Sequence, residues 1–356
     1  MALDIKTEFS QLLEDIEDEM GKVLSERDDG TRPLYDMLAY HLGIGEHRGA
    51  GGKRLRSLIG LLAYQSLTGE YRKALPGVAA VELGHNFSLV HDDIEDQDRE
   101  RRHRPTVWAV WGVPMAINAG DTLFALSRLA LHRPVPEGEE DVPDRKKLDM
   151  MKMYDETCLA LCEGQYLDIS FEQRDDVRVE EYLDMIGKKT AALIAASVHA
   201  AAILATDDPQ IHEAYRRFGY DLGIAFQIAD DLKGAFGSSS QTGKREAGDI
   251  AKRKKTLPVI WALQNVDGDP GRRLREIYRP IIRALDGRAA PGAEQLLDEA
   301  TVSEVLRILE SCGARDYAVA EARRYRDQAI GDLVELPILA DGQQILVRLV
   351  QAIIDA

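Results

Sequence analysis

Apolar residues recur at helical spacing along most of the chain. Two of the clearest stripes are Phe9, Leu12, Leu13 and Ile16, and Leu55, Leu58, Ile59 and Leu62. An apolar residue at every third or fourth position gives a helix one face to bury against a core. Alternating runs of β-branched residues, which would predict strands, are nearly absent. The pattern therefore predicts an all-α protein.

Glycine, proline and aspartate interrupt the helical pattern at intervals. The main breaks are 49–52, 68–69, 133–143, 206–209, 234–248, 267–271 and 286–292. Such clusters mark turns and loops between helices. The stretch 133–143 is interpreted as a surface insertion. Since none of the breaks has the length of an interdomain linker and no solenoid period is present, we expect a single domain over 1–356.

The longest apolar stretch, Ala191–Ala205, is mostly alanine and includes Ser197 and His199. It is short for a membrane span and is expected to be a buried helix. The N-terminal segment mixes acidic and apolar residues and lacks the basic and apolar regions of a signal peptide. We therefore expect no membrane span and no export.

Composition narrows the class of protein further. The chain has 356 residues, 45% hydrophobic residues, three cysteines, and 45 Lys plus Arg against 61 Asp plus Glu, for a net charge of −16. These values exclude disorder and a disulfide scaffold, and the odd cysteine count favours a reducing, cytoplasmic location. So acidic a chain is not expected to bind nucleic acid unless its cations gather in one patch.

An acidic cluster follows the apolar run 81–90. If that helix continues, Asp92 and Asp96 lie on one face, with Asp93 beside them. Four arginines follow at once: Arg99, Arg101, Arg102 and Arg104. A solvated acidic helix end is the ordinary interpretation of such a run. Carboxylates beside arginines instead suggest a site for magnesium and a diphosphate, because Mg²⁺ combines few carboxylates with substrate phosphates.

A second acid pair, Asp230 and Asp231, also ends an apolar helical run. Gln227 precedes the pair on the same helical face. Cations follow again: Lys244, Arg245, Lys252, Arg253, Lys254 and Lys255. Helical bundles place metal sites between acid-bearing helices, so the two acidic clusters are expected on facing walls of one site.

A third cluster, Gly51-Gly52-Lys53-Arg54-Leu55-Arg56, lies at an expected helix start. Amide groups of a helix N-terminus together with Lys and Arg can bind an anion. A glycine pair before a basic helix start is common, and this cluster alone would say little.

Taken together, the motifs GGKRLR, HDDIED with RRHRPT, KKTAALIAAS, FQIADD and KRKKTLP resemble those of the trans-isoprenyl diphosphate synthases, the polyprenyl synthetase family, in order and spacing. The resemblance covers roughly 51–258. It implies an all-α bundle around a deep central cavity, normally a homodimer. It also implies a prenyltransferase that joins isopentenyl diphosphate to an allylic diphosphate, with three magnesium ions when substrate is bound.

The resemblance assigns roles to individual residues. The magnesium ligands would be Asp92, Asp93, Asp96, Asp230 and Asp231. The isopentenyl diphosphate site would comprise Lys53, Arg56, His85 and Arg102. The allylic diphosphate site would comprise Arg101, Lys189 and Lys254, with Thr190 and Gln227 near the developing carbocation. Lys244 is a further expected substrate-binding residue. Glu163, Gln165 and Asp168 match a helix motif with a supporting role.

The chain departs from the family pattern at the second acid motif. Gly234 stands where a third aspartate is usual, and Ser238 stands where a later aspartate occurs in some bacterial members. Lys252 and Arg253 replace an acidic and glycine pair. One carboxylate is therefore missing, and Asp249 is a candidate to assist through water. We expect weakened metal binding or altered substrate choice rather than inactivity.

Residues before the first acid motif predict product length. Phe87, Ser88 and Gly84 would form the floor of the cavity. A bulky side chain with a small neighbour suggests geranylgeranyl diphosphate as product, with farnesyl diphosphate as the alternative. Two other functions stay open at this point, a terpene cyclase of the same fold and a weakened regulatory subunit of a heteromeric synthase.

Overall fold

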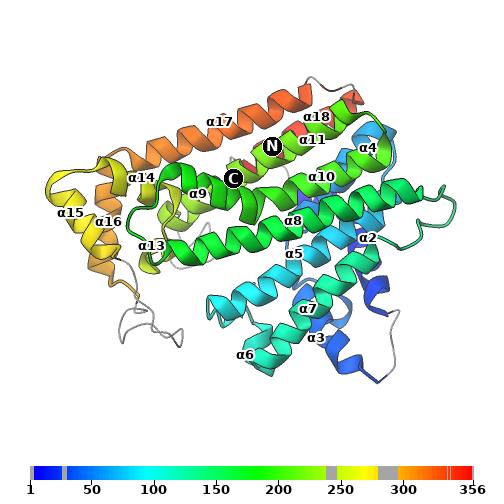
Figure 1. The fold of residues 1–356 in the computed structure, drawn as a ribbon, viewed down its shortest axis with the longest axis horizontal. Helices are drawn as coiled ribbons and strands as arrows, with labels where there is room; N and C mark the ends of the chain where they lie inside the picture. Colours follow the sequence, from blue (N-terminus) through cyan, green and yellow to red (C-terminus); the bar gives the residue numbers. More distant parts are fainter. Residues whose placement is uncertain are drawn as a thin grey trace. The chain divides into compact units, whose positions relative to one another are not determined.

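The computed structural model describes residues 4–25, 30–237, 247–279, 296–334, 336 and 338–354. Nearly all regular structure in these residues is helical (Figure 1). The expected all-α class is confirmed. A hairpin of two-residue strands, β1 (Glu100–Arg101) and β2 (Arg104–Pro105), was not expected from the sequence pattern.

The chain divides into two compact units, and several helices contribute to both. The first unit comprises 1–159, 193–219 and 332–352. Its elements are α1 (Ile5–Glu8), α2 (Ser10–Ser25), α3 (Arg32–Leu42), η1 (Gly45–His47), α4 (Leu55–Thr68), η2 (Arg72–Ala74), α5 (Leu75–Glu95), β1, β2, α6 (Val107–Trp111), α7 (Val113–Ala130), most of α8 (Asp144–Phe171), α10 (Ala192–Ala205), the start of α11 (Pro209–Phe236) and most of α18 (Ala340–Ile354).

The second unit comprises 160–192, 220–331 and 353–356. It holds the remainder of α8 and α11, together with α9 (Val179–Ile186), η3 (Gly187–Ala191), α13 (Gly248–Ala251), α14 (Leu257–Asn265), α15 (Gly268–Ile277), α16 (Glu299–Ser311) and most of α17 (Ala314–Val334). Figure 1 shows α15 and α16 beside α14. The expectation of one domain over 1–356 stays a prediction.

Local sequence signals explain where several helices begin and end. Gly43 and Gly69, just after α3 and α4, take left-handed backbone conformations. Residues other than glycine rarely adopt this conformation. Proline occupies the first turn of α5 at Pro76 and of α14 at Pro258, where the missing amide hydrogen costs nothing. The stretch 131–143 between α7 and α8 is not helical, which confirms the break predicted at 133–143, and its interpretation as a surface insertion stays a prediction.

In the first unit, the apolar stripes meet around α5, which lies beside α7 (Figure 1). The predicted stripe residues Ile16, Leu58 and Ile59 are at most 1% exposed. In the second unit, Tyr182, Met185 and Ile228 belong to a separate buried cluster. Burial of such side chains is the main force that orders both units.

The apolar stretch near the middle of the chain is helical and interior. One described helical run, Val179–Ala205, has the length and hydropathy to cross a bilayer, and 72% of its apolar window is buried inside the protein. The core helix of a folded domain passes the same test. The expectation that Ala191–Ala205 is a buried helix is confirmed, since Leu193, Ile194 and Val198 are at most 1% exposed.

Candidate functional site

The first acidic motif ends α5 as the sequence predicts. Asp96 donates its backbone N–H to the carbonyl of Asp92, 2.8 Å away, so the last turn of helix places both residues on one face. Asp92 is half-buried, Asp93 is 1% exposed and Asp96 is exposed. Carboxylates at the negative end of a helix dipole are unfavourable without a cation. The motif therefore presents a cluster that attracts positive charge.

Asp93 and Arg101 form an ion pair across the hairpin that follows α5. Arg101 Nε lies 2.7 Å from Asp93 Oδ1, whereas Asp93 Oδ2 is buried with no hydrogen-bond partner. Burial raises the pKa of Asp93 to about 6, against the opposing effect of Arg101. A buried oxygen without a partner is one that a bound cation would satisfy.

The two residues at the tip of this hairpin are strained. Arg102 has φ 54° and His103 has φ 60°. A two-residue turn of this kind requires positive φ at both positions and normally uses Asn and Gly. Backbone strain of this kind is often kept at functional sites, because it aims a side chain. Here it directs the guanidinium of Arg102 toward Gly52.

The glycine pair before α4 makes room for two guanidinium groups. A Cβ on Gly51 would lie 2.4 Å from Arg54 Nη2, and one on Gly52 would lie 2.7 Å from Arg102 Nη2. Arg54 turns inward and pairs with Glu82 at 3.3 Å and Glu17 at 3.4 Å. The sequence did not reveal this structural role of Arg54, although its neighbour Lys53 is exposed as a ligand-binding lysine requires.

Arg56 and Arg102 each leave one guanidinium nitrogen buried without a hydrogen-bond partner. Arg56 Nη1 lies 3.1 Å from His85 Nε2, but Arg56 Nε and Arg102 Nη1 have no hydrogen-bond partner. Burial, reinforced by Arg54, lowers the pKa of Arg102 to about 10, and burial beside Arg56 holds the pKa of His85 well below its usual value. Buried donors of this kind fit an anion such as a diphosphate.

His41 on α3 belongs to the same group and was missed by the sequence analysis. It lines a small cavity of about 20 Å³ with Tyr40, Asp93, Arg101 and Arg102. Its Nε2 has no hydrogen-bond partner, and burial, together with Arg102, lowers its pKa to about 3. No motif marks His41 in the sequence, because the loop 43–50 separates it from the glycine pair.

The predicted floor residues pack against α7 and α8. Phe87 is 8% exposed and meets the ring of Phe124 edge to face, at 5.1 Å between centroids. A Cβ on Gly84 would lie 1.9 Å from the hydroxyl oxygen of Tyr154, so Tyr154 fills the space that glycine leaves. Ser88 donates to the carbonyl of His85, 2.9 Å away. Phe124 and Tyr154 are contacts of the predicted floor residues that the sequence analysis did not find.

In the second unit, Lys189 and Thr190 lie on a π-helical turn, η3. Such turns inside α-helices frequently mark functional sites. Lys189 Nζ lies 2.5 Å from Asp168 Oδ2, and Thr190 Oγ1 donates to Gln227 Oε1, 2.9 Å away. A Cβ on Gly164 would lie 2.4 Å from the backbone nitrogen of Lys189, so the glycine of the α8 motif lets the π-turn pack closely.

The second acid pair divides between surface and interior. Asp230 is exposed, and Asp231 is 4% exposed. Gln227 Nε2 and the backbone N–H of Leu257 donate to Asp231 over 3.1 Å each, and Tyr182 donates through its hydroxyl. Burial raises the pKa of Asp231 to about 7. The assignment of Asp231 as a metal ligand stays a prediction, since both of its oxygens already accept hydrogen bonds.

The carboxylate of Asp249 fills the place beside Gly234. A Cβ on Gly234 would lie 1.9 Å from Asp249 Oδ2. Asp249 belongs to the short helix α13, so a carboxylate reaches this position from outside the motif. This proximity supports the expectation that Asp249 assists the second acid pair. Ser238 and Lys244 lie outside the described residues.

Lys254 and Lys255, which lie between α13 and α14, differ in exposure and contacts. Lys254 is exposed, as a phosphate-binding lysine requires. Lys255 donates to the carbonyls of Phe171, 2.6 Å away, and Arg174. It therefore caps the carboxyl end of α8, where a cation is favourable.

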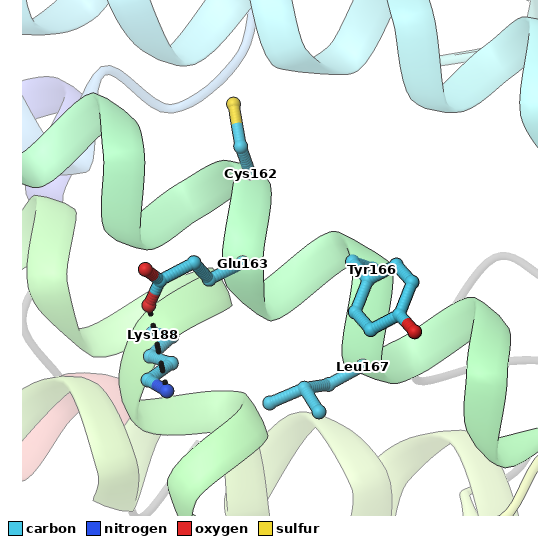
Figure 2. Close-up of a pocket in the computed structure, with 5 residues that line it drawn as sticks. All are labelled: Cys162, Glu163, Tyr166, Leu167 and Lys188. Carbon is cyan, nitrogen blue, oxygen red and sulfur yellow. Dashed lines mark ion pairs between the residues drawn. The ribbon is translucent and has the colours of Figure 1, made fainter.

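A surface groove lies beside the α8 motif. It has a volume of about 430 Å³ and is lined by Cys162, Glu163, Tyr166, Leu167 and Lys188 (Figure 2). Glu163 pairs with Lys188 at 3.5 Å. Cys162 is exposed, whereas Cys158, on the same helix, is buried.

The carboxylate oxygens in the described part of the chain suit magnesium that is also bound by water and substrate phosphates, and they do not form a complete metal site by themselves. Among the described residues, no group of three or more His, Cys, Asp or Glu side chains is arranged to hold a metal. Magnesium commonly binds through one or two carboxylates and completes its shell with water and substrate phosphates. The exposed Asp96 and Asp230 and the unsatisfied oxygen of Asp93 suit that mode of binding.

Comparison with known proteins gives a consistent result. The polyprenyl synthetase family profile matches residues 39–285. The chain is 37% identical over 316 residues to a (2E,6E)-farnesyl diphosphate synthase of Mycobacterium tuberculosis, covering 87% of this chain and 82% of that protein. It is 35% identical over 343 residues to a geranylgeranyl diphosphate synthase of the same species, covering 95% and 93%.

Solved structures agree. The crystal structure of geranylgeranyl pyrophosphate synthetase from Pyrococcus horikoshii matches with a TM-score of 0.85 and 32% identity, covering 99% of this chain and 98% of that one. A polyprenyl synthetase from Streptomyces coelicolor matches with a TM-score of 0.82 and 32% identity, covering 97% of each chain.

Proposed function

Since the chain belongs to the polyprenyl synthetase family, we propose that this prenyltransferase condenses isopentenyl diphosphate with an allylic diphosphate to a linear trans-isoprenyl diphosphate. The observation that carries the proposal is the pair of unpartnered buried groups, Arg56 Nε and Arg102 Nη1. Arg56 contacts His85 of α5, and Arg102 lines a small cavity with Asp93 of the same helix. A diphosphate would satisfy these donors. Such an anion site for the second substrate also argues against a terpene cyclase, which consumes one diphosphate.

Each group of residues has a role in this reaction. Lys53, Arg56, His85 and Arg102 hold isopentenyl diphosphate, while Arg101, Lys189 and Lys254 hold the allylic diphosphate. Lys244 is proposed as a further substrate-binding residue. Divalent metals serve this family in general. We propose magnesium here, up to three ions, held by Asp92, Asp93, Asp96 and Asp230, where it would offset the charge of the leaving diphosphate.

The chemistry needs no side-chain nucleophile. Loss of diphosphate leaves an allylic cation, which the double bond of isopentenyl diphosphate attacks, and a proton then passes to the released diphosphate. Thr190 and Gln227 direct oxygen dipoles at the developing positive charge. Arg101 is paired with Asp93 in this structure and is proposed to transfer its contact to the allylic diphosphate when substrate binds.

The product is proposed to be geranylgeranyl diphosphate, with farnesyl diphosphate as the alternative. The packing of Phe87 against Phe124, with Tyr154 over Gly84, supports a closed floor. Replacement of Phe87 by Ala should therefore lengthen the product. Product analysis by mass spectrometry would test this, and an unchanged chain length would remove the floor argument.

A homodimer in the cytoplasm is the proposed state. Helix α7 exposes Met115, Ile117 and Leu129 by 49%, 46% and 45%, and apolar side chains in such number on one helix favour an interface between copies. Sedimentation of the purified chain tests the dimer, and a monomer at micromolar concentration would contradict it.

The main experiment is mass spectrometry of products from the purified chain with magnesium, isopentenyl diphosphate and dimethylallyl, geranyl or farnesyl diphosphate. Growth by isoprene units is the expected result. Consumption of an allylic diphosphate without isopentenyl diphosphate would favour a cyclase. Absence of turnover would favour the weakened-subunit alternative.

A further inference from the structure

Three buried side chains, Tyr182, Asp231 and Thr190, and the partly buried Gln227 form a line of hydrogen bonds in the second unit. Tyr182 donates to Asp231 Oδ2, and Gln227 Nε2 donates to Asp231 Oδ1 at 3.1 Å. Thr190 then donates to Gln227 Oε1 at 2.9 Å. The line starts on α9, crosses to α11 and returns to the π-turn that directly follows α9.

The carboxylate of Asp231 is satisfied within the protein. Besides Tyr182 and Gln227, the backbone N–H of Leu257 donates to Oδ2 over 3.1 Å. The three donors are neutral dipoles, and Tyr182 and Asp231 are only 3% and 4% exposed. A buried carboxylate with this set of donors is fixed in orientation, because turning it would leave several donors unsatisfied.

This arrangement decides which way the Gln227 amide faces. Its NH₂ group donates to Asp231 Oδ1, so its carbonyl oxygen faces the opposite way, where it accepts from Thr190. A reversed amide would oppose its carbonyl to a carboxylate oxygen, with no hydrogen between the two acceptors. The orientation of Gln227 therefore depends on Asp231, and that of Asp231 depends in part on Tyr182.

We propose that Tyr182 is a positioning residue for prenyl transfer, which acts through Asp231 to hold the carbonyl dipole of Gln227 beside Thr190. The inference rests on the proposed function, in which Gln227 and Thr190 face the developing carbocation. It also separates the second acid pair by role, because Asp231 orients the amide whereas exposed Asp230 is left to face metal. Tyr182 itself touches neither substrate nor metal.

The Tyr182→Phe variant tests this directly, since it removes one hydroxyl and keeps the ring in its apolar cluster. We expect kcat to fall about 10- to 100-fold while KM for either substrate changes less than about threefold, because only the transition-state dipole is misplaced. The matched control is Tyr215→Phe, whose hydroxyl is also buried and lies 2.7 Å from Ser66 Oγ. Equal kinetics for the two variants would overturn the proposal.

A double-mutant cycle tests whether Tyr182 acts through Gln227. Gln227→Met removes the amide and keeps the volume of the side chain. If the proposal holds, adding Tyr182→Phe to this background causes little further loss of kcat, since the group being positioned is already absent. Losses that multiply independently would contradict it. Circular dichroism and melting of each variant confirm that only folded enzymes are compared.

A third measurement avoids turnover altogether. Magnesium with inorganic diphosphate should raise the melting temperature of the wild type, and the concentrations required report binding. Asp231→Asn should leave those concentrations unchanged, whereas Asp230→Asn should raise them. If Asp231→Asn weakens binding as strongly as Asp230→Asn does, Asp231 is a metal ligand and the proposal is wrong.

Failure of the inference is distinct from failure of the proposed function. Absence of chain growth by the wild type would remove the proposed function. An active wild type together with a Tyr182→Phe variant that behaves like Tyr215→Phe would remove only the role of Tyr182.

Discussion

The two acid pairs look alike in the sequence and differ in the structure. In each pair the second aspartate is buried, Asp93 at 1% exposure and Asp231 at 4%. Asp93 relies on one cation, Arg101, and keeps one oxygen unpartnered. Asp231 is held by three neutral donors that satisfy both oxygens. Two Asp-Asp sequences can therefore differ in role: one leaves a carboxylate available for ligands, and the other uses its carboxylate to fix neighbouring side chains.

The largest effect is expected at the first pair. Asp92→Ala should reduce turnover at least about a thousandfold, because it removes a proposed metal ligand from the leaving-group site. Steady-state assays with the favoured allylic substrate measure it. Glu100→Ala is the control, since Glu100 is an exposed acid on the adjacent β1 strand. Retained activity in Asp92→Ala would remove the metal role.

The free energy of unfolding should depend more on the second acid pair than on the first, which is the reverse of the order expected for turnover. Asp231→Ala leaves Tyr182, Gln227 and a backbone N–H without their acceptor and should cost about 2–4 kcal/mol. Asp93→Ala should cost only about 0–1 kcal/mol, because Arg101 is 29% exposed and can turn to water. Urea denaturation without metal or substrate compares them. A larger loss for Asp93→Ala would break the distinction between the pairs.

A smaller loss of activity is expected from a change at Gly234, where the carboxylate of Asp249 lies close to the helix of the second acid pair. Gly234→Ala places a Cβ 1.9 Å from Asp249 Oδ2, so the carboxylate must move. We expect about a tenfold loss of kcat/KM, because displacement of Asp249 disturbs the arrangement of the reacting groups while the fold is kept. Gly248→Ala is the matched control, with no atom within 4 Å of the added Cβ. Equal activity of the two variants would show that Asp249 plays no part.

Helical periodicity was sufficient for the fold class and for the helices that carry the acids. The stripe residues Ile16 and Leu58 are buried as expected, and Asp92 and Asp96 share a face because α5 continues to its predicted end. These features depend on local spacing, which a sequence displays directly.

Features set by packing between distant segments were not visible in the sequence. The π-turn at Lys189 depends on close approach to Gly164, and Arg54 points inward because Glu17 and Glu82 lie there. His41 joins the basic cluster through tertiary contact alone. Such arrangements depend on where residues distant in the sequence lie in space, and spacing along the chain does not give that information.

The smallest expected effect concerns strain in the hairpin beside the first pair. His103 is exposed and has φ 60°, a conformation that glycine adopts without penalty. His103→Gly should therefore stabilise the protein by about 0.5–1 kcal/mol, measured as a shift of the urea midpoint. His103→Ala removes the same imidazole but keeps the strain, so it should give no gain. An equal gain in both variants would assign the effect to the side chain, and the hairpin would then hold Arg102 in place without strain at its tip.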